Sequence, residues 1–301
     1  MRLLPILLLL GGAAQAAEFS ARGNLSAEYN VFPEDPAYSG QHGSSGSLSV
    51  EPDLYWSWND DADSLTLRPF ARLDGGDDER THADVRELLW LHWADRYALR
   101  LGIGEVFWGV TESQHLVDIV NQTDLVEDID GEDKLGQPMA WLSWPTDAGN
   151  FDLFVLPGFR ERTFPGREGR LRTEPPVDTG QAVYESASGD SHVDFAARWS
   201  HYAGPFDFGL SVFDGTSRDP RLVPGVDGAG RSVLIPHYDQ VTQFGLDGQA
   251  TLGSWLLKLE AIRRNHDAAV DYSAATAGFE YTLVGVFDSR YDLGLLLEYL
   301  Y

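Results

Sequence analysis

The chain has 301 residues, with 47 acidic and 22 basic side chains and a formal net charge of −25. This charge argues against nucleic-acid binding, which requires a basic surface. The chain contains no cysteine, which excludes disulfides and thiol chemistry, and its 9 Trp, 12 Tyr and 15 Phe argue against a disordered acidic chain.

Residues 1–16 have the pattern of a Sec-type signal peptide. Arg2 provides a positive start, Leu3 to Leu10 form a short apolar run, and Ala14-Gln15-Ala16 fits the small-x-small cleavage rule. The run is shorter than the about 20 residues of a membrane-spanning helix. We therefore expect export, with the mature domain over 17–301; an apolar first strand is the alternative.

Apolar and polar residues alternate from Phe19 to Val31. This run exceeds the about five or six residues of an ordinary strand and is long enough to cross a bilayer at a tilt. Similar runs follow at 48–58, 65–73, 85–93, 97–103, 137–145, 149–158, 191–202, 204–214, 239–252, 254–265, 272–286 and 290–301. The pattern predicts an all-β fold, an antiparallel up-and-down transmembrane β-barrel of about 13 strands.

The connections between these runs alternate in length. Short ones are predicted at 59–64, 94–96, 146–149, 203–204, 253–254 and 288–289, and longer ones near 32–46, 75–83, 105–136, 159–190, 215–238 and 266–271. Outer-membrane barrels have short periplasmic turns and longer extracellular loops, and bacterial single-chain barrels have even strand numbers. We therefore expect a Gram-negative outer-membrane barrel that is truncated at its carboxyl end.

If the apolar face contacts lipid, the opposite face lines the lumen. The charged side chains expected to line a pore are Arg22, Arg68, Arg72, Arg100, Arg198, Asp247, Lys258 and Arg264. The alternative is that these charges pair inside a filled barrel.

The connection 105–136 carries nine carboxylates and one lysine, yet it has too many apolar residues to be disordered. Leu116, Val117, Ile119 and Val120 have helical spacing, with Thr111 as a possible N-cap. We expect this loop to fold into or across the barrel and narrow it. The predicted constriction residues are Glu105, Trp108, Glu112, His115, Asp118, Asn121 and Asp124.

The connection 159–190, the second long inserted loop that we expect, has a basic segment in which Arg160, Arg162, Arg167, Arg170 and Arg172 lie close together. Facing acidic and basic loops would create a transverse field that selects solutes by polarity. Equally, these arginines could bind lipopolysaccharide phosphates outside the barrel.

Other chemical sites are not predicted. A calcium loop with Gly131 as its turn glycine would begin at Val126, which cannot act as a ligand. Ser113 and His115 are two residues apart, a poor spacing for facing each other on a helix. We expect no enzyme activity, no metal and no cofactor.

The segment 101–139 resembles a family of uncharacterised, porin-like proteobacterial outer-membrane barrels. The similarity rests on Trp108, Gly109, Glu112, Asn121 and Asp124, and on the segment 156–167. The resemblance implies an outer-membrane barrel, with no assigned substrate and no catalytic residues.

The expected function is a porin-like channel for small polar solutes, in contact with outer-membrane lipid and lipopolysaccharide, whose oligomeric state is not predicted. The alternatives are a non-conducting structural or adhesive barrel and a membrane-embedded hydrolase.

Overall fold

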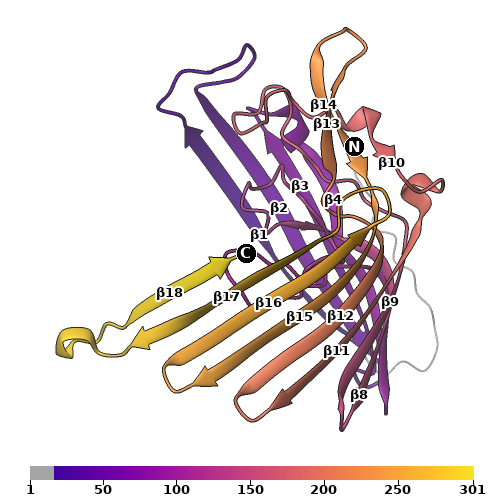
Figure 1. Cartoon of the computed structure of the whole chain (residues 1–301), viewed down its shortest axis with the longest axis vertical. Coiled ribbons are helices and arrows are strands. Elements are labelled where there is room, and N and C mark those ends of the chain that lie inside the picture. Colours follow the sequence, from indigo (N-terminus) through magenta and orange to yellow (C-terminus); the bar gives the residue numbers. More distant parts are fainter. Residues whose placement is uncertain (1–16) are drawn as a thin grey trace.

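The computed structural model describes residues 17–301, and the predicted signal peptide lies outside the described residues. Thirteen strands form one sheet in which each strand pairs antiparallel with the next in the row (Figure 1). Each corresponds to one predicted run, so the predicted fold and strand number are confirmed. The strands are β1 (Glu18–Val31), β2 (Ser44–Trp58), β3 (Asp63–Asp74), β4 (His82–Ala94), β5 (Tyr97–Gly104), β8 (Gln137–Thr146), β9 (Gly149–Pro157), β11 (Val193–Ala203), β12 (Phe206–Thr216), β15 (Gln240–Leu252), β16 (Trp255–His266), β17 (Tyr272–Leu283) and β18 (Leu293–Leu300).

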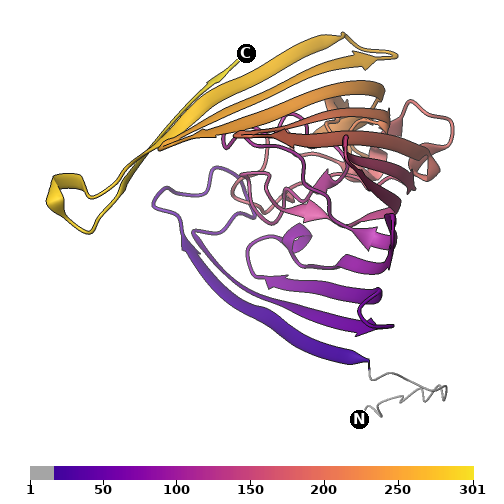
Figure 2. The same ribbon diagram turned by 90° about the horizontal axis from the view of Figure 1, so that it is seen from below.

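The sheet curves round, with β1 and β18 at its two ends (Figure 2). Its outward face is apolar and exposed. Its inward face is covered along the middle strands, whereas β1 and β18 are exposed on both faces. In β9, Leu153 and Val155 are 53% and 42% exposed, whereas their neighbours Phe154 and Leu156 are 2% and 0% exposed. Successive strand residues face opposite sides, so the alternation seen in the sequence is the alternation between the two faces of this wall.

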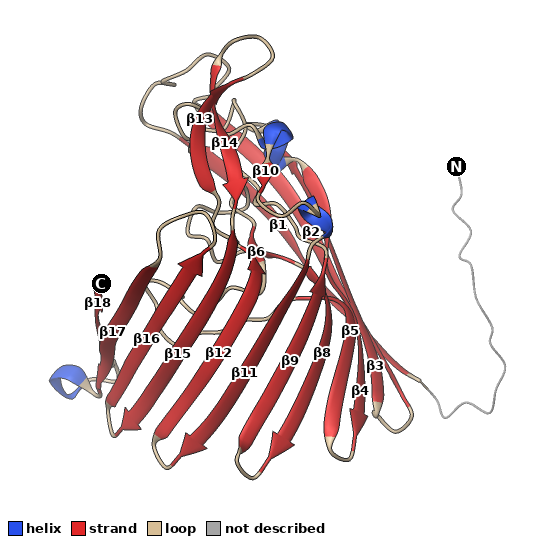
Figure 3. Cartoon of the chain, turned by 45° about the vertical axis from the view of Figure 1, so that its right-hand side comes forward, coloured by secondary structure: helices blue, strands red, loops and turns tan. Residues whose placement is uncertain are grey.

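The connections alternate in length as predicted, and the short turns lie together at one end of the sheet (Figure 3). One prediction of length is wrong, because the connection between β17 and β18 spans 284–292 and includes the 3-10 turn η4 (Val286–Asp288). A local irregularity has a simple cause: the β3–β4 register shifts between Arg68 and Pro69, where proline offers no N–H to the ladder.

The long connections contain structure of their own. β13 (Arg221–Val226), β14 (Ser232–Tyr238) and β10 (Val183–Tyr184) form a small sheet beyond the end of the barrel wall (Figures 1 and 3). β6 (Gln122–Thr123) pairs with β7 (Lys134–Leu135). Within residues 17–301 the other helical turns are η1 (Asp78–Arg80), η2 (Thr179–Gln181) and η3 (Gly189–Ser191). No helix in this range is long and apolar enough to span a bilayer.

Candidate functional site

The connection 105–136 lies inside the curve of the sheet and is called the inserted loop below (Figure 2). Asn121 joins its two ends. The side-chain amide donates to the carbonyls of Gly104 (2.9 Å) and Leu135 (2.8 Å), and Oδ1 accepts the N–H of Val106 (2.8 Å). Only a side chain with both donors and an acceptor makes all three bonds.

Apolar side chains fix the middle of the loop against the wall. Val117, Ile119 and Val120 are buried, but this stretch is irregular, so the predicted helix is wrong. Its apolar residues pack instead on inward-facing residues of the strands. The cluster comprises Val106, Trp108, Val117, Ile119, Val120, Met139, Phe154, Leu156, Ala196, Phe213, Val241 and Ile262.

A single buried carboxylate of β16, Glu260, binds four donors of the inserted loop. Oε1 accepts from Val110 N (2.7 Å), Thr111 N (2.9 Å) and Thr111 Oγ1 (2.8 Å), and Oε2 accepts from Val117 N (3.1 Å). Gly109 stands beside it with φ +137°, and a Cβ there would lie 2.8 Å from Glu260 Oε1. In the segment Trp108–Glu112, glycine at position 109 therefore leaves room for this carboxylate, which a side chain would obstruct.

Two further wall residues hold the same part of the loop. Glu298 of β18 accepts the backbone N–H groups of Glu112 (2.9 Å) and Ser113 (2.7 Å). Lys258 of β16, whose side chain is buried, pairs with Glu112 (2.5 Å) and with Glu280 of β17.

On the other side of the lumen, arginines of β3 and β4 hold the loop's carboxylates. Each holds one of them: Arg68 pairs with Glu105 (2.7 Å), Arg72 with Glu127 (2.7 Å) and Arg86 with Asp124 (2.5 Å). Each arginine also pairs with a carboxylate outside the inserted loop. The inserted loop is thus attached both to β3–β4 and to β16–β18, across the interior of the curved sheet.

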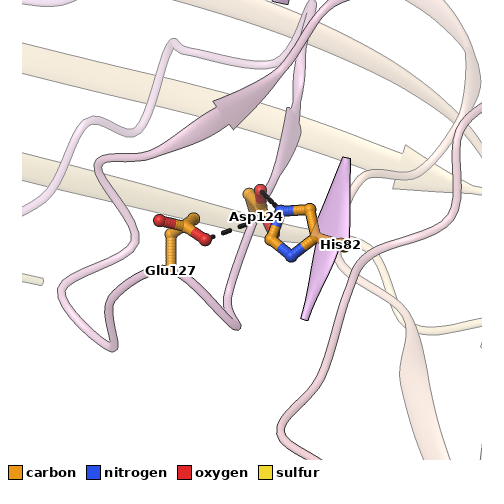
Figure 4. Close-up of side chains that lie close together, drawn as sticks. All are labelled: His82, Asp124 and Glu127. Carbon is orange, nitrogen blue, oxygen red and sulfur yellow. Dashed lines mark ion pairs between the residues drawn. The ribbon is translucent and has the colours of Figure 1, made fainter. Parts of the chain in front are cut away.

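His82, Asp124 and Glu127 bring ligand-type atoms within 4.8 Å of one another (Figure 4). Such residue types bind metals. Both carboxylates, however, already accept charged hydrogen bonds, Asp124 from Arg86 (2.5 Å) and Glu127 from Arg72 (2.7 Å). Because two guanidinium charges lie where a cation would bind, we interpret the group as an ion-pair cluster.

Burial and charge shift two loop carboxylates in opposite directions. Burial raises the pKa of Asp118 to about 6, although Lys134 lies 3.3 Å away. For Asp124, burial alone would raise the pKa, but the hydrogen bond to His82 and the charge of Arg86 lower it to about 2. Asp118 also accepts the N–H of Trp108 (3.3 Å), while His115 pairs with Glu132 (3.1 Å).

The five arginines of 159–190 have other partners. Four of them form ion pairs: Arg160 with Asp84 (2.8 Å), Arg162 with Asp219 (2.7 Å), Arg167 with Asp227 (3.0 Å) and Arg172 with Glu174 (2.6 Å). Arg170 donates a hydrogen bond to the Glu34 carbonyl (2.9 Å). Within the described chain, none of them forms an ion pair with the inserted loop, although Arg162 donates a hydrogen bond to the Gln122 side chain (3.3 Å).

The remaining predicted pore-lining residues also have side-chain partners, although those of Arg100 are uncharged. Arg22 contacts Asp53 (2.8 Å) but is otherwise exposed, and Arg198 makes two bonds to Asp247 (2.6 and 2.7 Å). Arg100 lies over the Trp141 ring (4.0 Å to its centroid) and bonds Ser143 (3.1 Å), and Arg264 bonds Gln243 (2.8 Å) and Asp219 (2.9 Å). Much of the wall's charge is therefore internally compensated.

Three residues that hold the inserted loop in place were not predicted from the sequence. Glu260 and Glu298 look like any other lumen-facing acid, and Arg218, just beyond β12, carries no pattern at all. Arg218 is buried, donates to the Val120 carbonyl (3.0 and 3.1 Å) and pairs with Asp194 (2.5 Å). The sequence does indicate that the backbone N–H groups of a long, irregular loop need acceptors. It does not indicate which side chains supply them.

No family model and no curated protein matches the chain. Among solved structures, OmpT, an outer membrane protein of Vibrio cholerae, is similar with a TM-score of 0.53 at 13% identity, covering 95% of this chain and 78% of that one. Its loop L8 deletion mutant has a TM-score of 0.52 at 12% identity, covering 95% and 82%. OprB of Pseudomonas putida has a TM-score of 0.43 at 13% identity, covering 94% and 74%, too low to support an argument. The likeness to OmpT shows the fold alone: this chain has the fold of an outer-membrane β-barrel.

Proposed function

We propose that the chain is an outer-membrane channel for diffusion of small polar solutes and that the inserted loop is its constriction. The observation that carries this proposal is a wall with an exposed apolar outer face and a charged inner face, crossed by a loop attached on both sides. An exposed apolar band around the outside of a strand wall is typical of a barrel whose outer face contacts lipid. We also propose an export signal at 1–16, membership of the uncharacterised porin-like family, and no enzyme activity.

A polar part of the interior supports a water-filled path. Beside β1, β2 and β3 lies a pocket of about 450 Å³, lined by residues that include Arg22, Asp53, Tyr55 and Arg68. The apolar cluster of the inserted loop packs instead on strands from β8 to β16. The part of the lumen filled by the apolar cluster and the polar pocket therefore lie on different sides of the barrel.

The outer-membrane partners follow from the same placement. The apolar outer face would contact lipid, and the loops would meet lipopolysaccharide. Arg167, whose side chain is 44% exposed, is the loop arginine best suited to a phosphate contact.

Single-channel recording in planar bilayers tests the proposal with the complete protein. We expect discrete conductance steps that persist after removal of contaminating porins by refolding from denaturant. A protein that refolds into bilayers without conductance would refute the channel.

One specific observation favours a second candidate, the non-conducting structural barrel. The wall charges are largely paired and the loop core is buried, as in a filled barrel. The same recording separates the two candidates. The hydrolase alternative has less support, because His115 pairs with Glu132 (3.1 Å) and no described contact joins it to the Ser113 hydroxyl.

A further inference from the structure

A pocket of about 660 Å³, called the turn-side pocket below, is lined by the start of the inserted loop and by β8, β9, β11, β12 and β15. Its lining includes Phe107 of the loop, Asn150 of β9, and Ser200 and Tyr202 of β11. It also includes Asp147, in one of the short turns that lie together at one end of the sheet (Figure 3). The pocket therefore lies between the inserted loop and the short-turn end of the barrel. Its volume is within the range of about 300–1,000 Å³ that is typical of small-molecule sites.

Two aromatic side chains of the turn-side pocket are exposed, Phe107 at 57% and Tyr202 at 73%. The Phe107 ring stands roughly perpendicular to the His115 ring, with centroids 4.8 Å apart, and it takes no part in the apolar cluster that fixes the loop. Tyr202 lies on the inward face of β11, because it follows Arg198 by four positions and alternate residues share a face. On the outer face an exposed ring contacts lipid, but inside the lumen it faces water. These two rings therefore lack an apolar partner.

Hydrogen-bonding groups without partners line the same pocket. The amide nitrogen of Asn150 donates to Asp152 (2.6 Å), while its oxygen accepts no bond within residues 17–301. The hydroxyl groups of Ser200 and Tyr202 also have no hydrogen-bond partner in this range. A hydroxyl group both donates and accepts. The pocket thus combines uncharged donors and acceptors with exposed rings.

The place in this lining that would best hold a cation is already filled. Asp247 is buried and lies beside the Trp108 ring, but it accepts two bonds from Arg198 (2.6 and 2.7 Å). The guanidinium of Arg198 also lies over that ring, 5.5 Å from its centroid. Two further carboxylates of the lining are exposed near the short turns, where salt screens them. The free groups of the pocket therefore suit an uncharged ligand.

We infer that the turn-side pocket binds a pyranose sugar, with Phe107 and Tyr202 against the faces of its rings. The inference rests on the proposed channel function and names the class of solute. A pyranose has C–H groups on its faces and hydroxyl groups around its edge, so one ligand satisfies both the exposed rings and the unpartnered polar groups. A channel must also release its solute, so the binding is weak, with a dissociation constant of about 1 mM.

Cellobiose, a disaccharide of two pyranose rings, is the probe. Added during single-channel recording, it should interrupt the current, with half of the current blocked at about 1 mM. Mannitol, an open-chain polyol, has hydroxyl groups but no ring face, and it should require at least about tenfold more. Titration calorimetry of the refolded protein in detergent measures cellobiose binding without requiring conductance.

Two substitutions test the contact with the sugar rings. Phe107→Leu and Tyr202→Leu each remove a flat ring but keep an apolar side chain, and each should raise the half-blocking cellobiose concentration about fivefold. Tyr202→Phe keeps the ring and should keep most of the affinity. The matched control is Phe195→Leu, which removes an exposed ring from the outward face of the same strand and should leave the titration unchanged.

The outcomes separate the sugar site from the channel. Cellobiose binding in calorimetry without conductance would overturn the channel and support the site. Conductance without block or binding by cellobiose would overturn the site and leave the channel. Equal block by mannitol, or stronger block by the amine spermidine, would overturn the assignment to a pyranose. An equal effect of Phe195→Leu and the two pocket variants would overturn the role of the two rings, and conductance steps retained in every variant exclude misfolding as the cause.

Discussion

Replacing Glu260 with alanine should release the inserted loop from the wall. The substitution removes the acceptor of four hydrogen bonds and leaves the N–H groups of Val110, Thr111 and Val117 without it. Hydrogen bonds to a charged group contribute about 1.5–3 kcal/mol each, and they are not additive. We therefore expect docking of the loop to weaken by about 5 kcal/mol, roughly a thousandfold or more in the docking equilibrium.

Single-channel recordings measure this release. Wild-type channels should show steady open levels, whereas Glu260→Ala should show frequent excursions to larger conductance. Glu260→Gln keeps one acceptor oxygen without the charge and should be intermediate.

The matched control is Asp207→Asn on β12. Asp207 is exposed, and the one bond to its carboxylate comes from Gln249 at 3.4 Å. It should leave the open level unchanged. If Glu260→Ala is as quiet as the wild type and as resistant to proteolysis within 105–136, this carboxylate does not hold the loop.

Four further predictions concern the same loop. Gly109→Ala should reproduce the noise of Glu260→Ala, because φ +137° disfavours alanine and its Cβ would lie 2.8 Å from the carboxylate; normal recordings would contradict this. Asn121→Asp removes two donors and should speed hydrogen exchange of residues 105–136, which unchanged exchange would disprove. The pKa of Asp118 is raised to about 6, so docking of the loop should lose about 2 kcal/mol as the pH rises from 4 to 6. Hydrogen exchange should find this pH dependence missing in Asp118→Asn. The pKa of Asp124 is lowered to about 2, so its contribution of about 2 kcal/mol to docking of the loop should be present above pH 4 and disappear as the pH falls to 2. Hydrogen exchange of the loop that does not change between pH 4 and pH 2 would count against this. Asp124→Asn should abolish the pH dependence.

The strands were predictable because their physical cause is local. A strand that faces lipid on one side and the interior on the other must alternate residue by residue, and the run 149–158 does so without reference to any other part of the chain. The small sheet of β13 and β14 was missed for a related reason. Its strands are short, contain Pro224 and Pro236, and pair away from the main sheet, so neither length nor alternation marks them.

The loop's anchors could not be predicted because they are distant in sequence. Thr111 and Glu260 are 149 positions apart, and nothing near either residue indicates the other. The spacing of the apolar residues in 116–120 fits a helix, but it fits an irregular segment packed against a curved wall equally well. Asn121 and Asp124 belong to the predicted constriction residues, but their contacts, as a cross-link and as an ion-pair partner, required coordinates.

The proposed channel requires that ions pass the inserted loop on their way through the barrel. The chain has no cysteine, so a single cysteine can be introduced at Asp130, an exposed residue of the inserted loop, and, as a control, at Leu153 on the outward face. A bulky, charged thiol reagent added during single-channel recording should reduce the current through Asp130→Cys and leave Leu153→Cys unchanged. Current through Asp130→Cys that stays constant after complete labelling would contradict the account.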